Sequence, residues 1–328
     1  MNTETRPSSD ASMYAGRSAS LSLSDWILPL FIVVTGLIAG IIQPQFFTGD
    51  NMLNLARQAV PLLILSLGQA VAIIRGGLDL SLASVMSFAG VAGTMVMIDQ
   101  GMVMGIMTML IASVLLGMVS GLIIAWFNTS PLVITLGMLS VAKALALILS
   151  GGVPLYDVPA DFVDLIGFGS LLGVPNTVWI ALLLTVLVTV LLRHTLFGRY
   201  VYAIGSNASA AAKSGVNVRF YTVLVYMVSG FCAGVGAVVL TAWTSSAQPV
   251  AAPNLTLQSL AAVVLGGVAL TGGAGGIRQV FIGVLVLTLL SNVMNMIGVS
   301  AYYQTLAVGV VIILAVILDR FRRTDDHH

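Results

Sequence analysis

Side chains that could do chemistry are sparse in this sequence, and the motifs that could have a function lie in three short stretches, at residues 75–81, 196–218 and 265–276. The first stretch places Arg75 and Asp79 around paired glycines, the second is polar and basic, and the third is rich in glycine. No G-x-x-x-x-G-K-S/T phosphate loop, H-E-x-x-H zinc motif or nucleophile elbow occurs in the sequence. We therefore expect no catalysis, no bound cofactor and no metal centre in this chain. If the chain transports a solute against its concentration gradient, the energy must come from an ion gradient or from a partner.

The first stretch, residues 75–81, has the composition of a turn that leads into a helix. Gly76 and Gly77 allow a tight turn with positive φ. Asp79 and Ser81 then stand where their side chains could cap the N-terminus of the next helix. Arg75 lies four residues before Asp79, so an ion pair across the turn is an alternative use of that carboxylate.

The composition indicates that most of the chain lies in a lipid bilayer. It is 58% hydrophobic and only 8% charged, with a mean hydropathy of +1.06. A water-facing surface needs far more charge than this, and helices satisfy the backbone groups that cross a bilayer. The net charge of +1 and the lack of a basic stripe argue against nucleic acid as a partner. The sequence predicts an all-α polytopic membrane protein in contact with membrane lipid.

Apolar runs of about 20 residues, each able to cross about 30 Å of hydrocarbon, predict about ten transmembrane helices. The expected spans cover roughly 26–43, 59–74, 80–98, 102–126, 131–149, 176–192, 220–243, 255–271, 278–297 and 302–318. Glycine pairs interrupt the pattern near 255–297, where a broken or re-entrant segment is the alternative. The chain then divides into a disordered cytoplasmic tail (1–25), a single transmembrane domain (26–318) and a cytoplasmic C-terminal tail (319–328).

The distribution of Lys and Arg predicts the orientation of these spans, because cytoplasmic loops carry the excess of both residues. With the N-terminus inside, Arg57 falls in an outside loop and Lys143 within a span. Both termini are then cytoplasmic. The remaining basic residues fall inside: Arg6, Arg17, Arg75, Arg193, Arg199, Lys213, Arg219, Arg278, Arg320, Arg322 and Arg323.

An ion-coupled carrier usually places acidic or histidine residues in mid-membrane, and no expected span has one at its centre. Lys143 is the clear intramembrane charge, so it is either part of a substrate path or structurally paired. Polar residues in or beside the spans either line a weakly polar path or form interhelical hydrogen bonds. These further path candidates are Ser84, Ser87, Asn292, Asn295 and Gln304.

The polar stretches also resemble a known family. Gly76-Gly-Leu-Asp-Leu-Ser81 looks like the GGIDLS-type signature of the permease subunits of bacterial ABC sugar importers, the ribose, arabinose and xylose class. A second signature of that family is similar to Phe197-Gly-Arg199, Tyr202-Ala-Ile-Gly-Ser-Asn207 and Lys213-Ser-Gly-Val216. In the family this second signature follows the sixth span.

A third motif extends the resemblance to nearly the whole chain, in order. Leu265-Gly-Gly267 and Gly272-Gly273 resemble the paired-glycine hairpin that the family has before its ninth span. The chain departs from the family where Ala208-Ser209 replaces the usual Pro-Glu and Ala212 replaces the usual Arg. Any docking contacts made by these residues are therefore expected to differ from the usual ones.

The resemblance implies that the cytoplasmic loop 193–219 contains a coupling helix that docks in a cleft of an ATPase subunit. Asn207 or Ser209 can act as its N-cap, and Gly215 can end it. The residues expected to couple to the ATPase are Arg199, Gly205, Ser206, Asn207, Ala208, Ser209, Ala211, Lys213, Ser214 and Gly215. The signature positions expected to be structural are Gly76, Gly77, Asp79, Ser81, Gly266, Gly267, Gly272 and Gly273.

The function implied by the resemblance is import of a monosaccharide across the bacterial inner membrane by alternating access. The partners implied are a second permease subunit, a cytoplasmic ABC ATPase that uses ATP and Mg²⁺, and a periplasmic sugar-binding protein. One alternative keeps this machine and changes its cargo to a nucleoside or an autoinducer-type furanosyl compound. The alternative of another class is an ion-coupled secondary carrier, which needs no ATPase.

Overall fold

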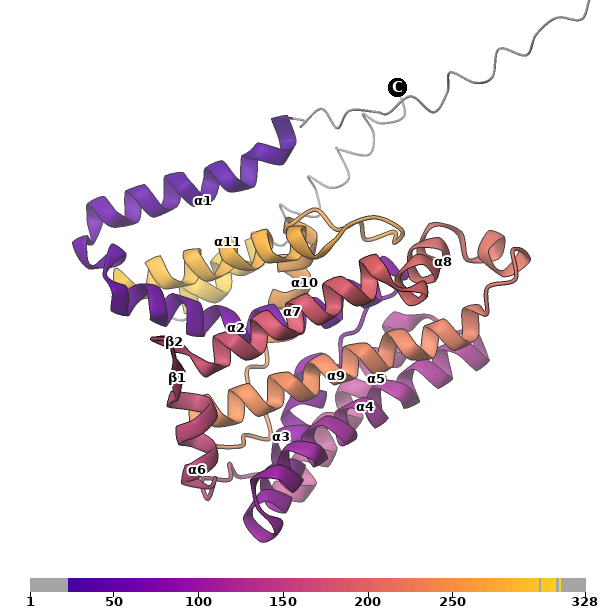
Figure 1. Ribbon diagram of the computed structural model, residues 1–328, viewed down its shortest axis with the longest axis horizontal. Helices are drawn as coiled ribbons and strands as arrows, with labels where there is room; N and C mark the ends of the chain where they lie inside the picture. The colour runs from indigo at the N-terminus through magenta and orange to yellow at the C-terminus, as the bar shows by residue number, and fades with distance from the viewer. Residues whose placement is uncertain (1–22, 301, 311–312, 314–328) are drawn as a thin grey trace, which may run out of the picture.

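The computed structural model describes residues 23–300, 302–310 and 313. These residues form a bundle of long helices with small elements at its edges (Figure 1). The helices are α1 Leu23–Ile42, α2 Gly49–Ile74, α3 Leu82–Gln100, α4 Met102–Phe127, α5 Pro131–Ser150, α6 Ala160–Phe162, α7 Asn176–His194, α8 Leu196–Lys213, α9 Val218–Thr244, α10 Leu255–Leu265 and α11 Ile277–Met296. The short elements are the helical turns η1 Pro44–Phe47 and η2 Val163–Phe168 and the two-stranded hairpin β1 Ser170–Leu171 and β2 Val174–Pro175.

Two helices, α2 and α9, form the centre of the bundle. Every residue of α2 from Ala59 to Ile74 is buried, and α9 packs against α2, α3 and α4. The α4–α9 contact depends on small residues, as is typical of membrane helices. At Gly117 of α4, a Cβ atom would overlap the backbone carbonyl of Tyr226 in α9. This close approach fixes α9 against α4 along much of its length.

The outer helices present apolar side chains to their surroundings. On α4, α5 and α7 most residues are exposed or half-buried, and the exposed ones include Ile111, Val133, Ile148 and Leu183. A soluble protein buries such faces, whereas lipid tails solvate them. Within the described residues, seven helices are long and apolar enough to cross a membrane: α2, α3, α4, α5, α7, α9 and α11. The structure thus supports the helical membrane-protein class, and the count of ten spans stays a prediction.

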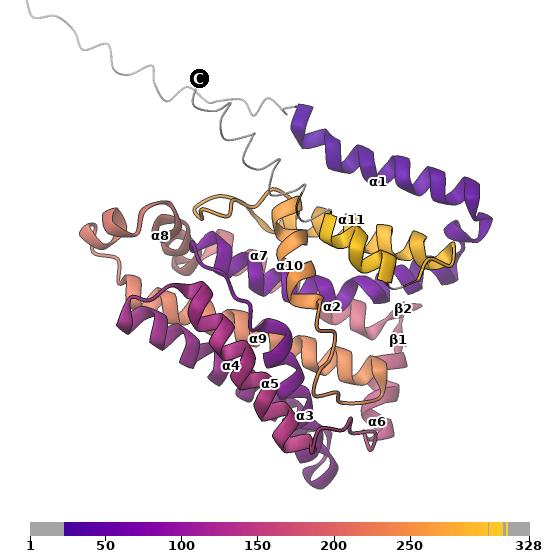
Figure 2. The same ribbon diagram turned by 180° about the vertical axis from the view of Figure 1, so that it is seen from behind.

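The span expected over 255–271 is wrong as a continuous helix. The helix α10 ends at Leu265 after 11 residues, which at 1.5 Å per residue is too short to cross about 30 Å of hydrocarbon. A loop from residue 266 to residue 276 follows, and Gly267, Gly272, Gly273 and Gly275 all have positive φ there. The broken-helix alternative therefore describes this region. Seen from behind, α10 lies close to α2 and α11, and its loop reaches toward α8 (Figure 2).

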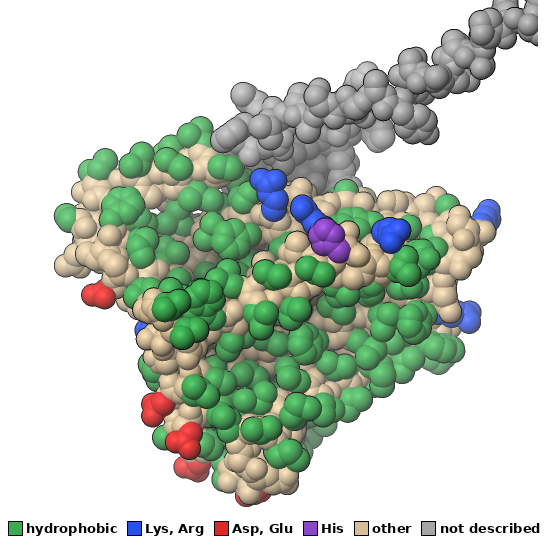
Figure 3. Space-filling model, viewed as in Figure 1, with side chains coloured by type: hydrophobic (Ala, Val, Ile, Leu, Met, Phe, Trp, Pro, Cys, Tyr) green, Lys and Arg blue, Asp and Glu red, His purple; other side chains and the backbone are tan. Residues whose placement is uncertain are grey.

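Charges separate toward opposite ends of the bundle. Lys and Arg side chains gather at the end where α8 lies, and Asp side chains gather at the opposite end, near α6 and β1 (Figure 3). The segment from residue 151 to residue 175 folds over this acidic end, where Leu155 pairs with Ala247 beyond the end of α9. The expected tails 1–25 and 319–328 lie almost entirely outside the described residues, as does the end of the span expected over 302–318.

Candidate functional site

The three stretches 75–81, 196–218 and 265–276 meet at one point of the structure, which we call the glycine junction (Gly76, Gly205, Gly272 and Gly273). The Gly273 N–H donates a hydrogen bond to the Ile74 carbonyl oxygen at 2.8 Å. A Cβ atom on Gly205 would overlap that same oxygen and would lie 2.5 Å from the Gly273 nitrogen. The end of α2, the first part of α8 and the loop before α11 are thus in backbone contact.

Two further contacts complete the glycine junction. Gly272 has a φ of +87°, and a Cβ atom there would lie 2.8 Å from the Gly76 Cα and 3.1 Å from the Gly205 Cα. The Tyr202 hydroxyl of α8 donates to the Gly275 carbonyl oxygen at 2.8 Å. Burial raises the pKa of this hydroxyl, and the nearby Arg193 partly offsets the rise. Backbone packed this closely leaves little room for α8 to move without the other two segments.

A polar stripe on α9 holds the stretch from Arg75 to Ser81. Arg75 donates to the Thr222 hydroxyl at 2.7 Å, and the Tyr226 hydroxyl donates to the Leu78 carbonyl oxygen at 3.4 Å. The Ser229 hydroxyl donates to Asp79 Oδ2 at 2.6 Å. Sequence reasoning missed this stripe, although residues 222, 226 and 229 are spaced for one face of a helix.

The expected capping role of Asp79 and Ser81 is wrong. The Asp79 Oδ1 atom accepts from the Ser81 N–H at 3.0 Å and from the Ser81 hydroxyl at 2.6 Å, in a local turn. The N-terminus of α3 is capped from elsewhere, because the Ala83 N–H donates to the Thr256 hydroxyl of α10 at 3.0 Å. Ser81 and Ser229 donate hydrogen bonds to the two carboxylate oxygens of Asp79. Arg75 donates to Thr222 and not to Asp79. Burial raises the pKa of Asp79, and its hydrogen bonds from Ser229 and Ser81 act against that rise.

The helix α8 consists of two parts joined at Asn207, which has non-helical backbone angles. The first part buries Phe197, Val201 and Ile204 against the bundle. The second part begins where Asn207 Oδ1 accepts from the Ala210 N–H at 2.9 Å. Of the two N-caps that the sequence allowed, Asn207 is therefore the one used.

The second part of α8 ends at the expected glycine and projects from the bundle. Gly215 has a φ of +87°, and the Val216 N–H donates back to the Ala211 carbonyl oxygen at 3.1 Å, as at many helix C-termini. Within residues 208–213 only Ala211 is buried. Lys213 and the flanking Ser206 and Ser214 are exposed, as is Arg199 earlier in α8. The described structure leaves this short helix open to a partner.

The path candidates fall on three helices, α3, α5 and α11, and on the segment after α11. Asn292 of α11 is buried and exchanges amide hydrogen bonds of 3.3 and 3.4 Å with Asn51 of α2, so it joins helices. The exposed Asn295 accepts from Gln304 at 2.6 Å. Lys143 is exposed on α5. Their role in transport stays a prediction.

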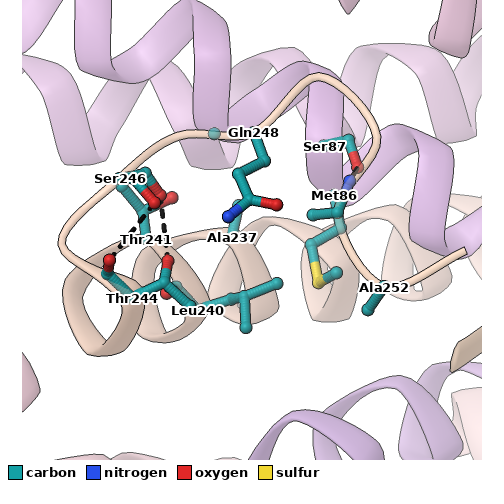
Figure 4. Close-up of a pocket in the computed structure, with 11 residues that line it drawn as sticks. Met86, Ser87, Ala237, Leu240, Thr241, Thr244, Ser246, Gln248 and Ala252 are labelled. Atoms are coloured by element: carbon teal, nitrogen blue, oxygen red, sulfur yellow. Dashed lines mark hydrogen bonds between the residues drawn. The ribbon is translucent and has the colours of Figure 1, made fainter. Parts of the chain in front are cut away.

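Ser87 lines a cavity of about 160 Å³ between α3, α9 and the loop before α10 (Figure 4). Its hydroxyl donates to the Ala83 carbonyl oxygen and accepts from the Ala251 N–H, both at 3.0 Å. Ser84, on the same helix, is half-buried and does not line this cavity. The Ser87 hydroxyl therefore joins the loop to α3 at the wall of a small cavity.

Comparison with known proteins defines the class of this chain. Residues 51–316 match the family described as branched-chain amino acid transport system / permease component, and the chain belongs to that family. The chain is similar to the ribose import permease protein of Bacillus subtilis, at 37% identity over 89% of this chain and 91% of that protein.

Other relatives share this class. The ribose import permease protein of Haemophilus influenzae is 35% identical over 89% of this chain and 92% of its own length. The D-allose transport system permease protein of Escherichia coli is 30% identical over 98% and 99%. A solved metal-chelate type ABC transporter in an inward-facing conformation is a more distant likeness, with 14% identity, a TM-score of 0.45 and coverage of 84% of this chain and 90% of that one.

Proposed function

We propose that this chain is the transmembrane subunit of an ATP-binding-cassette importer that moves a monosaccharide across the bacterial inner membrane. The relatives named above are permeases for ribose and D-allose, and an Azospirillum brasilense relative, 32% identical over 97% of this chain, is an L-arabinose permease. The family description mentions amino acids, but these sugar permeases support a sugar as the cargo. No bond in the sugar is broken.

The observation that carries this proposal is the connection of an exposed helix to the centre of the bundle. The second part of α8 (residues 208–213) is short, capped at Asn207 and rich in alanine. Small side chains let another protein approach the backbone closely, and Lys213 offers charge to an acidic surface. A displacement of this helix would be transmitted to α2 and to the loop before α11 through the contacts of Gly205 with Ile74 and Gly273.

This proposed function requires three partner proteins. A separate cytoplasmic ABC ATPase would bind and hydrolyse ATP with Mg²⁺, and the basic end of the bundle would face it, in keeping with the excess of Lys and Arg inside. A periplasmic sugar-binding protein would deliver the sugar at the acidic end. A second permease subunit would complete the path, and the exposed Lys143 on α5 would meet that subunit or the path.

Uptake into proteoliposomes tests this proposal. The chain is reconstituted with its co-purifying ATPase and binding protein, and labelled ribose, arabinose and allose are offered with ATP inside the vesicles. We expect uptake of one of these sugars that requires both ATP and the ATPase. ATP-driven uptake of a nucleoside or furanosyl compound alone would change the cargo. Uptake driven by an ion gradient without the ATPase would contradict the proposal.

A further inference from the structure

A groove runs between α7 and α11 on the outer surface of the bundle, at the basic end. Its volume is about 380 Å³. Its lining combines cationic, hydroxyl and apolar side chains, and none of these residues is acidic. The lining residues are Thr185, Thr189, Arg193, Ile277, Arg278, Phe281 and Ile282.

One end of this groove carries two positive charges. Arg193 lies in the last turn of α7 and Arg278 in the first turn of α11, and both are exposed. The N-terminus of α11 has no side-chain cap and no acidic residue in its first turn. A cation beside the positive end of a helix dipole is unfavourable. An anion held between the two arginines would relieve this repulsion.

The rest of the groove suits hydrocarbon. Thr185, Thr189 and Arg193 are spaced four apart, so they form one stripe about 12 Å long on α7. The Thr185 and Thr189 hydroxyls donate to backbone carbonyls one turn back, at 2.7 and 2.6 Å. Their hydroxyl donors are therefore used within the helix, and Phe281 and Ile282 form the opposite wall.

We infer that this groove binds an anionic phospholipid, with its phosphate between Arg193 and Arg278 and an acyl chain along Phe281 and Ile282. Basic pockets between membrane helices are suited to anionic head groups, because charge and apolar surface are offered together at the interface. The claim concerns lipid binding alone and does not depend on the transported solute.

The position of the groove connects the lipid with the glycine junction. Arg193 lies close enough to Tyr202 to act on its hydroxyl, which donates to the Gly275 carbonyl oxygen at 2.8 Å. Gly275 is followed by Gly276, the residue that precedes α11. A bound head group would therefore sit beside the contact between α8 and the loop before α11, and its removal should loosen that contact.

Binding measured on the purified full chain tests the inference. Phosphatidylglycerol and phosphatidylcholine with the same acyl chains are titrated in detergent, with native mass spectrometry as the readout and inorganic phosphate as a third arm. We expect phosphatidylglycerol to bind in preference to phosphatidylcholine. Arg193→Gln and Arg278→Gln should each weaken binding of the anionic lipid about fivefold. The matched control, Arg219→Gln, changes an exposed arginine outside the groove and should leave binding unchanged.

A second variant keeps the test independent of charge. Thr189→Trp fills the groove while both arginines stay, and it should remove the preference for phosphatidylglycerol. Equal binding of the two lipids by the wild type would overturn the inference. Unchanged binding in both arginine variants would do the same. Competition by inorganic phosphate at concentrations comparable to those of the lipid would identify an anion site rather than a lipid site. The wild-type chain could also bind no phosphatidylglycerol, because its own termini or a second copy fill the groove. That result would contradict the inference too.

Discussion

The Ile74 carbonyl oxygen accepts the Gly273 N–H at 2.8 Å, and Gly205 packs its bare backbone against the same oxygen. This single acceptor joins α2, the most buried helix, to the loop before α11 and to α8. The carbonyl groups of the last turn of a helix have no partner within that helix, so α2 gains a partner here only while the three segments stay together. The glycine junction therefore links the exposed surface of α8 to the centre of the bundle.

Gly205→Ala tests the glycine junction. The added methyl would overlap the Ile74 carbonyl oxygen, and overpacking of this kind typically costs about 1–3 kcal/mol. We expect a lower midpoint of thermal unfolding in detergent and fewer sugars imported per ATP hydrolysed. Gly137→Ala is the matched control, because nothing lies within 4 Å of a Cβ at this helical glycine. An unchanged midpoint and unchanged coupling in Gly205→Ala would count against the close packing described.

Asp79 variants separate hydrogen bonding from charge. Asp79→Asn keeps an oxygen for Ser81 and offers an N–H to the Ser229 hydroxyl, so we expect only a small loss of stability. Asp79→Leu leaves the hydroxyls of Ser81 and Ser229 without their acceptor, which costs about 1–3 kcal/mol. The free energies of unfolding of the two variants are compared with that of the wild type. Equal losses in both variants would show that the hydrogen bonds contribute nothing.

The pH dependence of stability tests the burial of Asp79. Burial raises its pKa in the folded chain, while the unfolded chain ionises at a pKa near the ordinary value of about 3.9. Between these two pKa values the unfolded state releases the proton first, so the wild type should lose stability as the pH rises. The unfolding midpoint of the wild type should therefore fall relative to that of Asp79→Asn as the pH rises above about 4. A wild type that gains stability relative to Asn over this range would contradict the assignment.

Asn207→Ala tests the cap of the second part of α8. Loss of an N-cap typically costs about 1 kcal/mol of local helix stability, so amides 208–214 should exchange with deuterium about fivefold faster. Asn207→Asp keeps an acceptor for the Ala210 N–H and is the matched control. Identical exchange in the Ala variant and the wild type would show that docking of the helix, not the cap, holds it.

The sequence predicted the long apolar helices well, since α2 to α5, α7, α9 and α11 follow its hydrophobic runs. It also identified all three stretches of the glycine junction, and it named Asn207 as one of two possible caps, of which the structure uses Asn207. It failed where a partner comes from a distant part of the chain, as when Thr256 caps α3 and Ser229 binds Asp79. Local spacing cannot reveal such contacts, because they depend on how α9 and α10 pack.

The path candidates show the same limit. Asn292 and Ser87 were chosen because polar groups in apolar spans usually face protein or water. In the structure Asn292 bonds to Asn51 of α2, and Ser87 bonds to the backbone of a loop. The polarity of a side chain alone does not distinguish an interhelical hydrogen bond from a place in the substrate path, because either role keeps the polar group away from lipid.

The central claim is that the second part of α8 is the surface through which an ATPase drives this chain, and a single-cysteine cross-link tests it most directly. The native Cys232 is fully buried, so a cysteine introduced at an exposed position is the accessible one. Ser209→Cys lies on α8, and Ser170→Cys is the matched control at the opposite end of the bundle. In the assembled complex we predict that Ser209→Cys cross-links to the ATPase in an ATP-dependent manner and that Ser170→Cys does not. Cross-linking of the ATPase at position 170 and not at 209 would contradict the account.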